Sequence, residues 1–122
     1  MEVVSFEIAK KLKEKGFREK VNAYYGKHEN IFDVHPALDM NDADYRASAP
    51  TISQVLKWLR EEKKIFVAID YYPAGYNADI YTGLSKKDGF FDNEQYINEC
   101  DCYNTYELAA IAGIEYCLDN LI

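Results

Sequence analysis

Residues 50–84 read PTISQVLKWLREEKKIFVAIDYYPAGYNADIYTGL and contain the clearest local patterns in this sequence. Proline is common at the first position of a helix, so Pro50 can begin one, and either Ser48 or Thr51 can cap the helix that follows. Four apolar residues then recur with the spacing of one helical face: Ile52, Val55, Leu56 and Leu59. The pattern predicts an amphipathic helix that ends near Lys63-Lys64.

The second half of this stretch predicts a pair of strands. Residues 65–72 are β-branched or aromatic except at Ala68 and Asp70. Because apolar side chains fall on both faces, we expect an interior strand that is covered at least partly on each side. The triplet Pro73-Ala74-Gly75 then favours a turn, and residues 78–84 return as a second strand.

Further elements lie on both sides of residues 50–84. Before them, Ser5 caps a helix predicted over residues 6–15, and residues 21–25 predict a short strand. Residues 27–49 show no sustained period, so they are either a functional loop or contain an element that the pattern does not reveal. After them, one strand is expected between residues 90 and 103, followed by a helix with Asn104 as its cap in a capping box.

The elements follow the order α-β-α-β-β-β-α and predict an α+β fold. We expect a small antiparallel sheet of three to four strands with about three helices packed on it. A chain of 122 residues, 48% hydrophobic and 29% charged, is typical of one folded domain. The sequence therefore predicts a single globular domain over residues 1–122.

The charge and the cysteine content limit the partners and the location that the sequence allows. The formal net charge of −7 argues against binding to nucleic acid or to a membrane surface. No segment is long and apolar enough to span a bilayer, and the first residues lack the pattern of a signal peptide. Three cysteines are an odd number for a disulfide framework. We therefore expect reduced thiols and a cytoplasmic location.

The charges are unevenly distributed along the chain. Residues 1–64 hold 12 Lys/Arg and 11 Asp/Glu, a net of +1, whereas residues 65–122 hold 2 and 10, a net of −8. Such a split can steer a basic partner, or one end of another copy of the chain, towards the acidic part. The simpler interpretation is an acidic segment that is only solvated.

Three stretches together resemble a known group of sequences. They are EIAKKLKEKGF at residues 7–17, APTISQVLKWLR at residues 49–60 and YNTYELAAIAGI at residues 103–114. The combination resembles small uncharacterised proteins that bacterial phages and other mobile elements encode. That family carries no established activity, so the resemblance implies an accessory role in a phage or a bacterium and assigns no catalytic residue.

Residues able to carry catalysis or to bind a metal are few. His28 and His35 are the only histidines and flank Asp33, which makes acid–base chemistry by His35 with Asp33 a hypothesis. The spacing matches no zinc or di-metal signature, and Cys100 and Cys102 lack a second cysteine pair. We therefore expect no metal, no cofactor and no catalytic residue, with surface histidines as the simpler interpretation.

Tyrosine is the outlier of the composition, with 11 copies. Five of them flank predicted turns or loops and form the candidate binding surface: Tyr71, Tyr72, Tyr76, Tyr24 and Tyr25. Tyrosine offers a large contact area at low entropic cost and is enriched at protein interfaces. In a core it also packs with its hydroxyl at the rim, so both interpretations stay open for these residues.

The leading hypothesis is a non-catalytic binding protein that docks a protein partner, or another copy of itself, through the sheet edge and the tyrosine-rich turn. A second hypothesis is a counter-defence protein whose carboxylates imitate the phosphates of nucleic acid, with an array formed by Asp88, Asp92, Glu94, Glu99 and Asp101. A third hypothesis is a small enzyme that uses His35 and Asp33.

Overall fold

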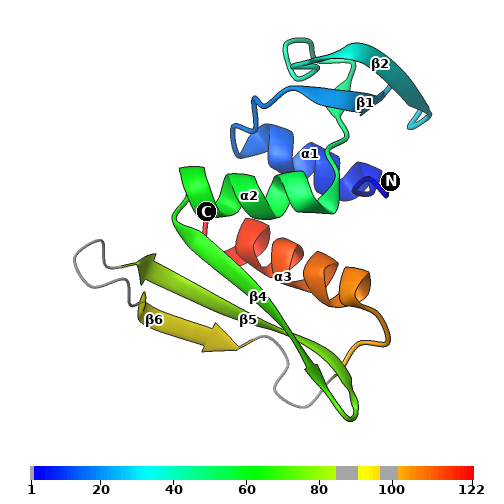
Figure 1. Ribbon diagram of the computed structural model, residues 1–122. Coiled ribbons are helices and arrows are strands. Elements are labelled where there is room, and N and C mark those ends of the chain that lie inside the picture. The colour runs from blue at the N-terminus through cyan, green and yellow to red at the C-terminus, as the bar shows by residue number, and fades with distance from the viewer. Residues whose placement is uncertain (1, 85–90, 97–101) are drawn as a thin grey trace. The chain divides into compact units, whose positions relative to one another are not determined.

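A computed structural model describes residues 2–84, 91–96 and 102–122 (Figure 1). The chain divides into two compact units, Met1–Gln54 and Val55–Ile122, and each is described by itself. The elements follow the order α1-β1-β2-β3-α2-β4-β5-β6-α3, which confirms the α+β class. Two antiparallel three-stranded sheets are present where the sequence predicted one sheet. The single domain over residues 1–122 stays a prediction.

Helix α1 (Phe6–Glu14) lies in the first unit, and its ends follow from local chemistry. The Ser5 hydroxyl accepts a hydrogen bond of 3.3 Å from an N–H of the first turn, a group that a helix otherwise leaves unpaired. At the other end Gly16 has a φ of +89°, and the N–H of Phe17 donates to the carbonyl of Leu12 at 2.9 Å. This glycine-based stop confirms the predicted helix, which ends one residue earlier than expected.

Strand β1 (Val21–Tyr25) of the first sheet was predicted, and the other two strands of this sheet lie in the segment in which the sequence shows no period. The order of the sheet is β2-β1-β3, with β1 between β2 (Ile31–Leu38) and the short β3 (Ala47–Ser48). Strands β2 and β3 are the elements that the pattern of residues 27–49 did not reveal. Strand β2 is exposed along nearly its whole length. A strand with water on both faces shows no alternation of apolar and polar residues from which it could be predicted.

A buried amide fixes the loop between β2 and β3. The Asn41 side chain donates to the carbonyl of Phe17 at 2.7 Å and accepts from the N–H of Ser48 at 2.8 Å. The Ser48 hydroxyl accepts in turn from the N–H of Met40 at 3.0 Å. Because Asn41 and Ser48 are both buried, these bonds satisfy polar groups that water cannot reach and tie the loop to the core of the unit.

Helix α2 (Ile52–Glu62) begins where the sequence predicted it, with Thr51 as its cap. The Thr51 hydroxyl accepts from the N–H of Gln54 at 3.2 Å, and the N–H of Thr51 donates to the Gln54 side chain at 2.9 Å. This reciprocal pair is a capping box. Val55 and Leu59 are fully buried, which confirms the predicted apolar face.

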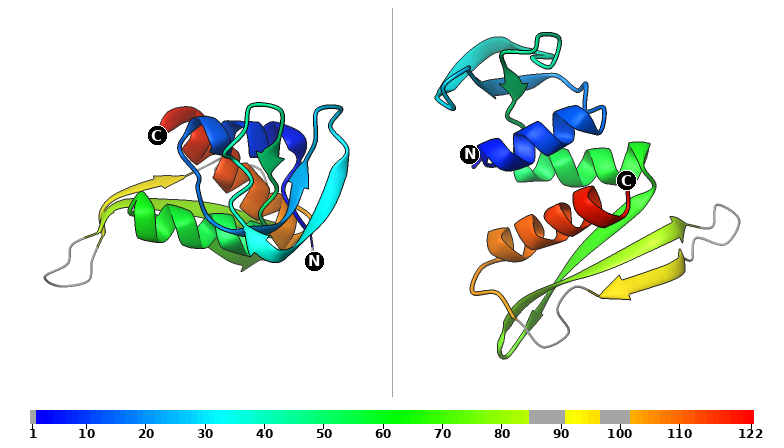
Figure 2. Two further views of the ribbon diagram at one scale, coloured as in Figure 1. Left: turned by 90° about the horizontal axis from the view of Figure 1, so that it is seen from above. Right: turned by 180° about the vertical axis from the view of Figure 1, so that it is seen from behind.

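The second unit contains the sheet β4-β5-β6 and helix α3. Strands β4 (Ile65–Tyr72) and β5 (Gly75–Leu84) form an antiparallel hairpin without a shift in register, and β6 (Phe91–Tyr96) pairs with the other side of β5. Helix α3 (Tyr106–Asn120) packs on β4 and β5 (Figure 1, Figure 2). The core of this unit joins apolar residues of the strands and the helix: Ile65, Ala78, Ile80, Ala110, Ile114, Cys117 and Leu118.

Two details of the second unit correct the sequence interpretation. The cap of α3 is Thr105, whose hydroxyl accepts from the N–H of Leu108 at 3.1 Å, and not Asn104, because the helix begins at Tyr106. Strand β4 lies at the edge of its sheet, with β5 as its neighbour among the described strands, although its composition predicted an interior strand. The remaining strand expected between residues 90 and 103 is β6, and the predicted antiparallel pairing of these strands is confirmed.

Candidate functional site

The tip of the β4–β5 hairpin carries three of the predicted binding residues, Tyr71, Tyr72 and Tyr76. Residues 73–74 form the turn, and Tyr72 pairs with Gly75 across it. Gly75 has a φ of +135°, a backbone conformation that glycine adopts readily and that a Cβ makes costly. The predicted turn therefore exists, and it is two residues long.

A second backbone segment closes on this tip. Tyr76 and Tyr103 exchange two backbone hydrogen bonds, of 2.8 and 2.7 Å, on the side of β5 that faces away from β4. A Cβ on Gly75 would lie 2.5 Å from the carbonyl oxygen of Tyr103, so only glycine fits there. Main-chain contacts on both sides of β5 therefore hold the tip in place.

The three tyrosines divide between the two faces of the sheet. Tyr71 and Tyr76 oppose each other on neighbouring strands, so they share one face, and their ring centroids lie 4.9 Å apart. Tyr72 is the next residue along β4 and points to the other face. Tyr71 is 72% exposed and Tyr72 is 44% exposed, so the tip presents aromatic surface on both faces.

Tyr24 and Tyr25 lie at the end of β1 in the first unit, where both are half-buried. The Tyr25 hydroxyl donates to the carbonyl of Val4 at 2.7 Å, and its ring meets the Phe6 ring edge-on with centroids 5.6 Å apart. Burial raises the pKa of Tyr25. Tyr24 stacks on Phe32 at 5.3 Å. Both rings are thus engaged within their unit and offer less free surface than the hairpin tip.

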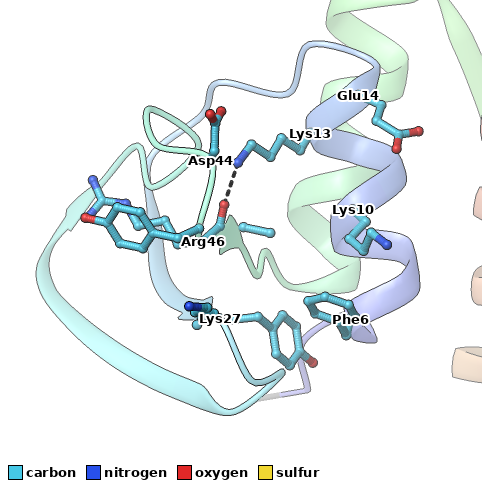
Figure 3. A pocket seen from close by; sticks show the side chains of 11 residues that line it. Phe6, Lys10, Lys13, Glu14, Lys27, Asp44 and Arg46 are labelled. Carbon is cyan, nitrogen blue, oxygen red and sulfur yellow. Dashed lines mark hydrogen bonds between the residues drawn. The ribbon is translucent and has the colours of Figure 1, made fainter.

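A cavity of about 540 Å³ lies in the first unit, between α1, the end of β1 and the loop before β3 (Figure 3). No sequence pattern pointed to it, because its lining comes from three separate segments of the chain. Charged side chains from all three line it: Lys10, Lys13, Glu14, Lys27, Asp44 and Arg46.

Two of the cations in this cavity have structural partners. The Lys13 ammonium donates to the carbonyls of Ala43 and Arg46, the latter at 2.7 Å (Figure 3). The Arg46 guanidinium pairs with Asp42, and this hydrogen bond lowers the pKa of the Asp42 carboxyl. Arg46 also donates to the carbonyl of Met40 at 3.2 Å. These contacts fix the loop that forms one wall of the cavity.

The other four charges of the cavity are two cations and two anions. Lys10 and Lys27 are cationic, and Glu14 and Asp44 are anionic. The Lys10 ammonium lies 5.5 Å from the centroid of the Phe6 ring, which is a cation–π contact within α1. The lining carries four cations and two anions in all, but Lys13 and Arg46 are already held by partners of their own, so the cavity identifies no single class of ligand.

The residues of the enzyme hypothesis lie on or near β2. Asp33 and His35 are two residues apart on this exposed strand, and Nδ1 of His35 lies 3.5 Å from the side-chain nitrogen of Asn22. His28 is exposed in the turn between β1 and β2. Among the described residues, no group of three or more His, Cys, Asp or Glu side chains is placed to hold a metal ion. The acid–base hypothesis stays a prediction.

The array of the phosphate-imitation hypothesis falls largely outside the described residues. Asp88, Glu99 and Asp101 lie outside them, and Asp92 and Glu94 belong to β6, of which the backbone alone is described. That hypothesis also stays a prediction.

Two of the three cysteines lie within the described residues. Cys100 lies outside the described residues, Cys102 is exposed, and Cys117 is buried on α3. Burial raises the pKa of Cys117 to about 12, so this thiol stays protonated near neutral pH. Because the thiolate is the reactive form, Cys117 acts as a small apolar residue of the core.

Comparisons with protein-family models, with curated proteins and with solved structures found no match. Within the parts of the chain that the structure describes, no helix combines the length and the apolar character needed to cross a membrane. Function must therefore be inferred from the geometry of the chain itself, and the hairpin tip is the candidate site with the most exposed aromatic surface.

Proposed function

We propose that this chain is a non-catalytic binding protein that docks a protein partner through the tip of the β4–β5 hairpin. The observation that carries this proposal is Tyr71, a residue that is 72% exposed although the centroid of its ring lies 4.9 Å from that of Tyr76. A ring that is already held in place loses little side-chain entropy when a partner covers it. Tyrosine is also enriched among the residues that dominate binding energy at protein interfaces.

The backbone of the tip supports the same function. The positive φ of Gly75 and the paired hydrogen bonds between Tyr76 and Tyr103 fix the position from which the tyrosines project. A partner therefore meets a preformed surface, which lowers the entropic cost of association.

Charge suggests the kind of surface that the partner presents. Residues 65–122, which include the whole hairpin, carry a net charge of −8. Opposite charge speeds the encounter of two proteins and disfavours wrong partners, so the partner presents a basic surface. In line with the resemblance of the sequence, the role is that of an accessory protein of the phage or mobile-element type that acts in the cytoplasm.

Affinity capture from a bacterial lysate tests this proposal with three forms of the tagged chain. The wild type defines the bound protein, and Tyr71→Ala with Tyr72→Ala removes the aromatic surface of the tip. Tyr45→Ala is the matched control, because Tyr45 is 63% exposed but lies at the cavity of the first unit.

We expect the double variant to lose the bound protein by about tenfold or more, as hot-spot tyrosines do, while Tyr45→Ala retains it. Capture that is equal in all three forms would exclude the hairpin tip. Loss in Tyr45→Ala alone would move the site to the cavity. Circular dichroism of each variant establishes that the fold is intact.

A further inference from the structure

Strand β4 combines the composition of an interior strand with a position at the edge of its sheet. Among the described segments, β5 alone pairs with it. The residues of β4 whose backbone groups point away from β5 follow from the bonding of Tyr76. The N–H and C=O of Tyr76 bond to Tyr103 and therefore point away from β4. Tyr71 opposes Tyr76 and must direct its own groups away from β5. Alternation along the regular strand gives the same outward direction to Ile69, Val67 and Ile65.

Exposed sheet edges in natural proteins are usually protected, and the first sheet of this chain follows that rule. Edge strand β2 contains Pro36, which has no N–H, and its pairing with β1 shifts register between Val21 and Ala23. The other edge strand, β3, has only 2 residues. Strand β4 has 8 residues, with no proline, no lysine and no shift in register. Among the described residues no strand pairs with the outward N–H and C=O groups of Ile65, Val67, Ile69 and Tyr71, so these groups can serve as a template for a further strand.

The charges at the two ends of β4 indicate which strand fits. Lys64 is exposed directly before β4, and Asp70 is exposed near its end. When two identical strands pair antiparallel, the beginning of one lies beside the end of the other. A strand that has a cation at its beginning and an acid near its end is therefore complementary to a second copy of itself.

We propose that a second copy of this chain pairs with β4 edge to edge, antiparallel, about a two-fold axis at Val67. In this register Val67 faces Val67 of the second copy, and Ile65 faces Ile69, so the outward backbone groups of both strands bond to each other. The pairing between β4 and β5 is left unchanged. The result is one continuous sheet through both copies.

Lys64 directly precedes β4 and has a φ of +58°, and the same register places it at the end of the interface where Asp70 of the other copy lies. The Lys64 ammonium donates to the carbonyl of Glu61 at 2.7 Å and has further N–H donors for a carboxylate. The inference rests on the proposed function because both use the β4–β5 hairpin as a binding element. Its occupant is a second copy of the chain at the edge of β4, and not the basic partner that the hairpin tip docks.

A charge-swap series tests the pairing, with the dimer dissociation constant measured by analytical ultracentrifugation at about 0.15 M salt. Asp70→Lys places two lysines together at both ends of the interface, and Lys64→Asp places two acids together. Like charges directly opposite on paired strands are destabilising, so each single variant should weaken the dimer by about tenfold or more. The double variant has the net charge of the wild type and should restore the wild-type constant to within about threefold.

Two control variants make the same changes in net charge elsewhere in the second unit. Glu115→Lys on α3 matches Asp70→Lys, and Lys57→Asp on α2 matches Lys64→Asp, because both positions are exposed helix residues. We expect neither control to weaken the dimer more than about twofold. Within one chain Lys64 and Asp70 lie about 20 Å apart along an extended strand, well beyond the screening length of about 8 Å. Restoration by the double variant can therefore arise only between copies.

A chain that stays monomeric at high concentration, or a double variant that is as weak as the single variants, would overturn the inference. Failure here is distinguishable from failure of the proposed function. A monomer that still needs Tyr71 and Tyr72 to capture another protein removes only the self-pairing. A dimer that responds to the charge swap, in a chain that captures nothing through its tyrosines, removes only the docking of another protein.

Discussion

Gly75 and Gly16 both adopt a left-handed backbone conformation, with φ of +135° and +89°, but their surroundings differ. A Cβ at Gly75 would lie 2.5 Å from the carbonyl oxygen of Tyr103, whereas a Cβ at Gly16 would meet no atom within 4 Å. Alanine at Gly16 therefore adds backbone strain alone. Alanine at Gly75 adds both strain and a clash with backbone that cannot rotate away.

We expect Gly75→Ala to lower the free energy of unfolding by about 3 kcal/mol, and Gly16→Ala by about 1 kcal/mol. Chemical denaturation of both variants measures the difference. Equal losses would contradict the close approach of Tyr103 to the hairpin tip, and with it the fixed platform beneath Tyr71 and Tyr76.

At the scale of the element, the sequence predicted those helices and strands that bury one apolar face. Helices α1 and α2 were placed within one or two residues of their observed bounds, because each buries one stripe of apolar side chains. The cap of α3 was placed one residue early, because Asn104 and Thr105 can both cap a helix and the pattern does not separate them. Strand β2 buries neither face, so no periodicity could reveal it.

The candidate site was predictable to a similar extent. The turn triplet and its flanking tyrosines located the hairpin tip, and the bounds of β4 were predicted as observed. Its place in the sheet was not predictable, because apolar side chains on both faces show that the faces are covered and say nothing about the edges. The cavity was equally hidden, since its lining comes from segments that only the fold brings together.

The capping box of α2 provides a prediction at this scale. The Thr51 hydroxyl and the N–H of Gln54 are 3.2 Å apart, and loss of such a bond leaves an N–H of the first turn unsatisfied. Thr51→Ala should lower the free energy of unfolding by about 1 kcal/mol. Ser53→Ala is the matched control, because Ser53 is exposed within the first turn of the same helix and should change stability by less than about 0.5 kcal/mol. Thermal unfolding that does not separate the two variants would contradict the capping role.

At the scale of the whole molecule, net charge opposes the pairing that local charges favour. Each copy carries a net charge of −7. Two small domains in contact have centres about 30 Å apart, and two such charges repel by about 2–3 kcal/mol at 0.01 M salt, where the screening length is about 30 Å. At about 0.15 M salt this repulsion is almost completely screened.

The pairs between Lys64 and Asp70 respond to salt in the opposite direction. They are exposed, and an exposed ion pair is worth about 0.2–1 kcal/mol, so two of them are worth at most about 2 kcal/mol. Because the charges of such a pair are only about 4 Å apart, the added salt removes about a third of this value, which is less than about 1 kcal/mol. The loss of repulsion is larger than the loss of attraction. The dimer should therefore become several-fold tighter between about 0.01 and 0.15 M salt, and change little above that range. Sedimentation equilibrium over a salt series measures this, and steady weakening from the lowest salt upward would show that attraction between opposite charges, and not the hydrogen-bonded edge of β4, holds the copies together.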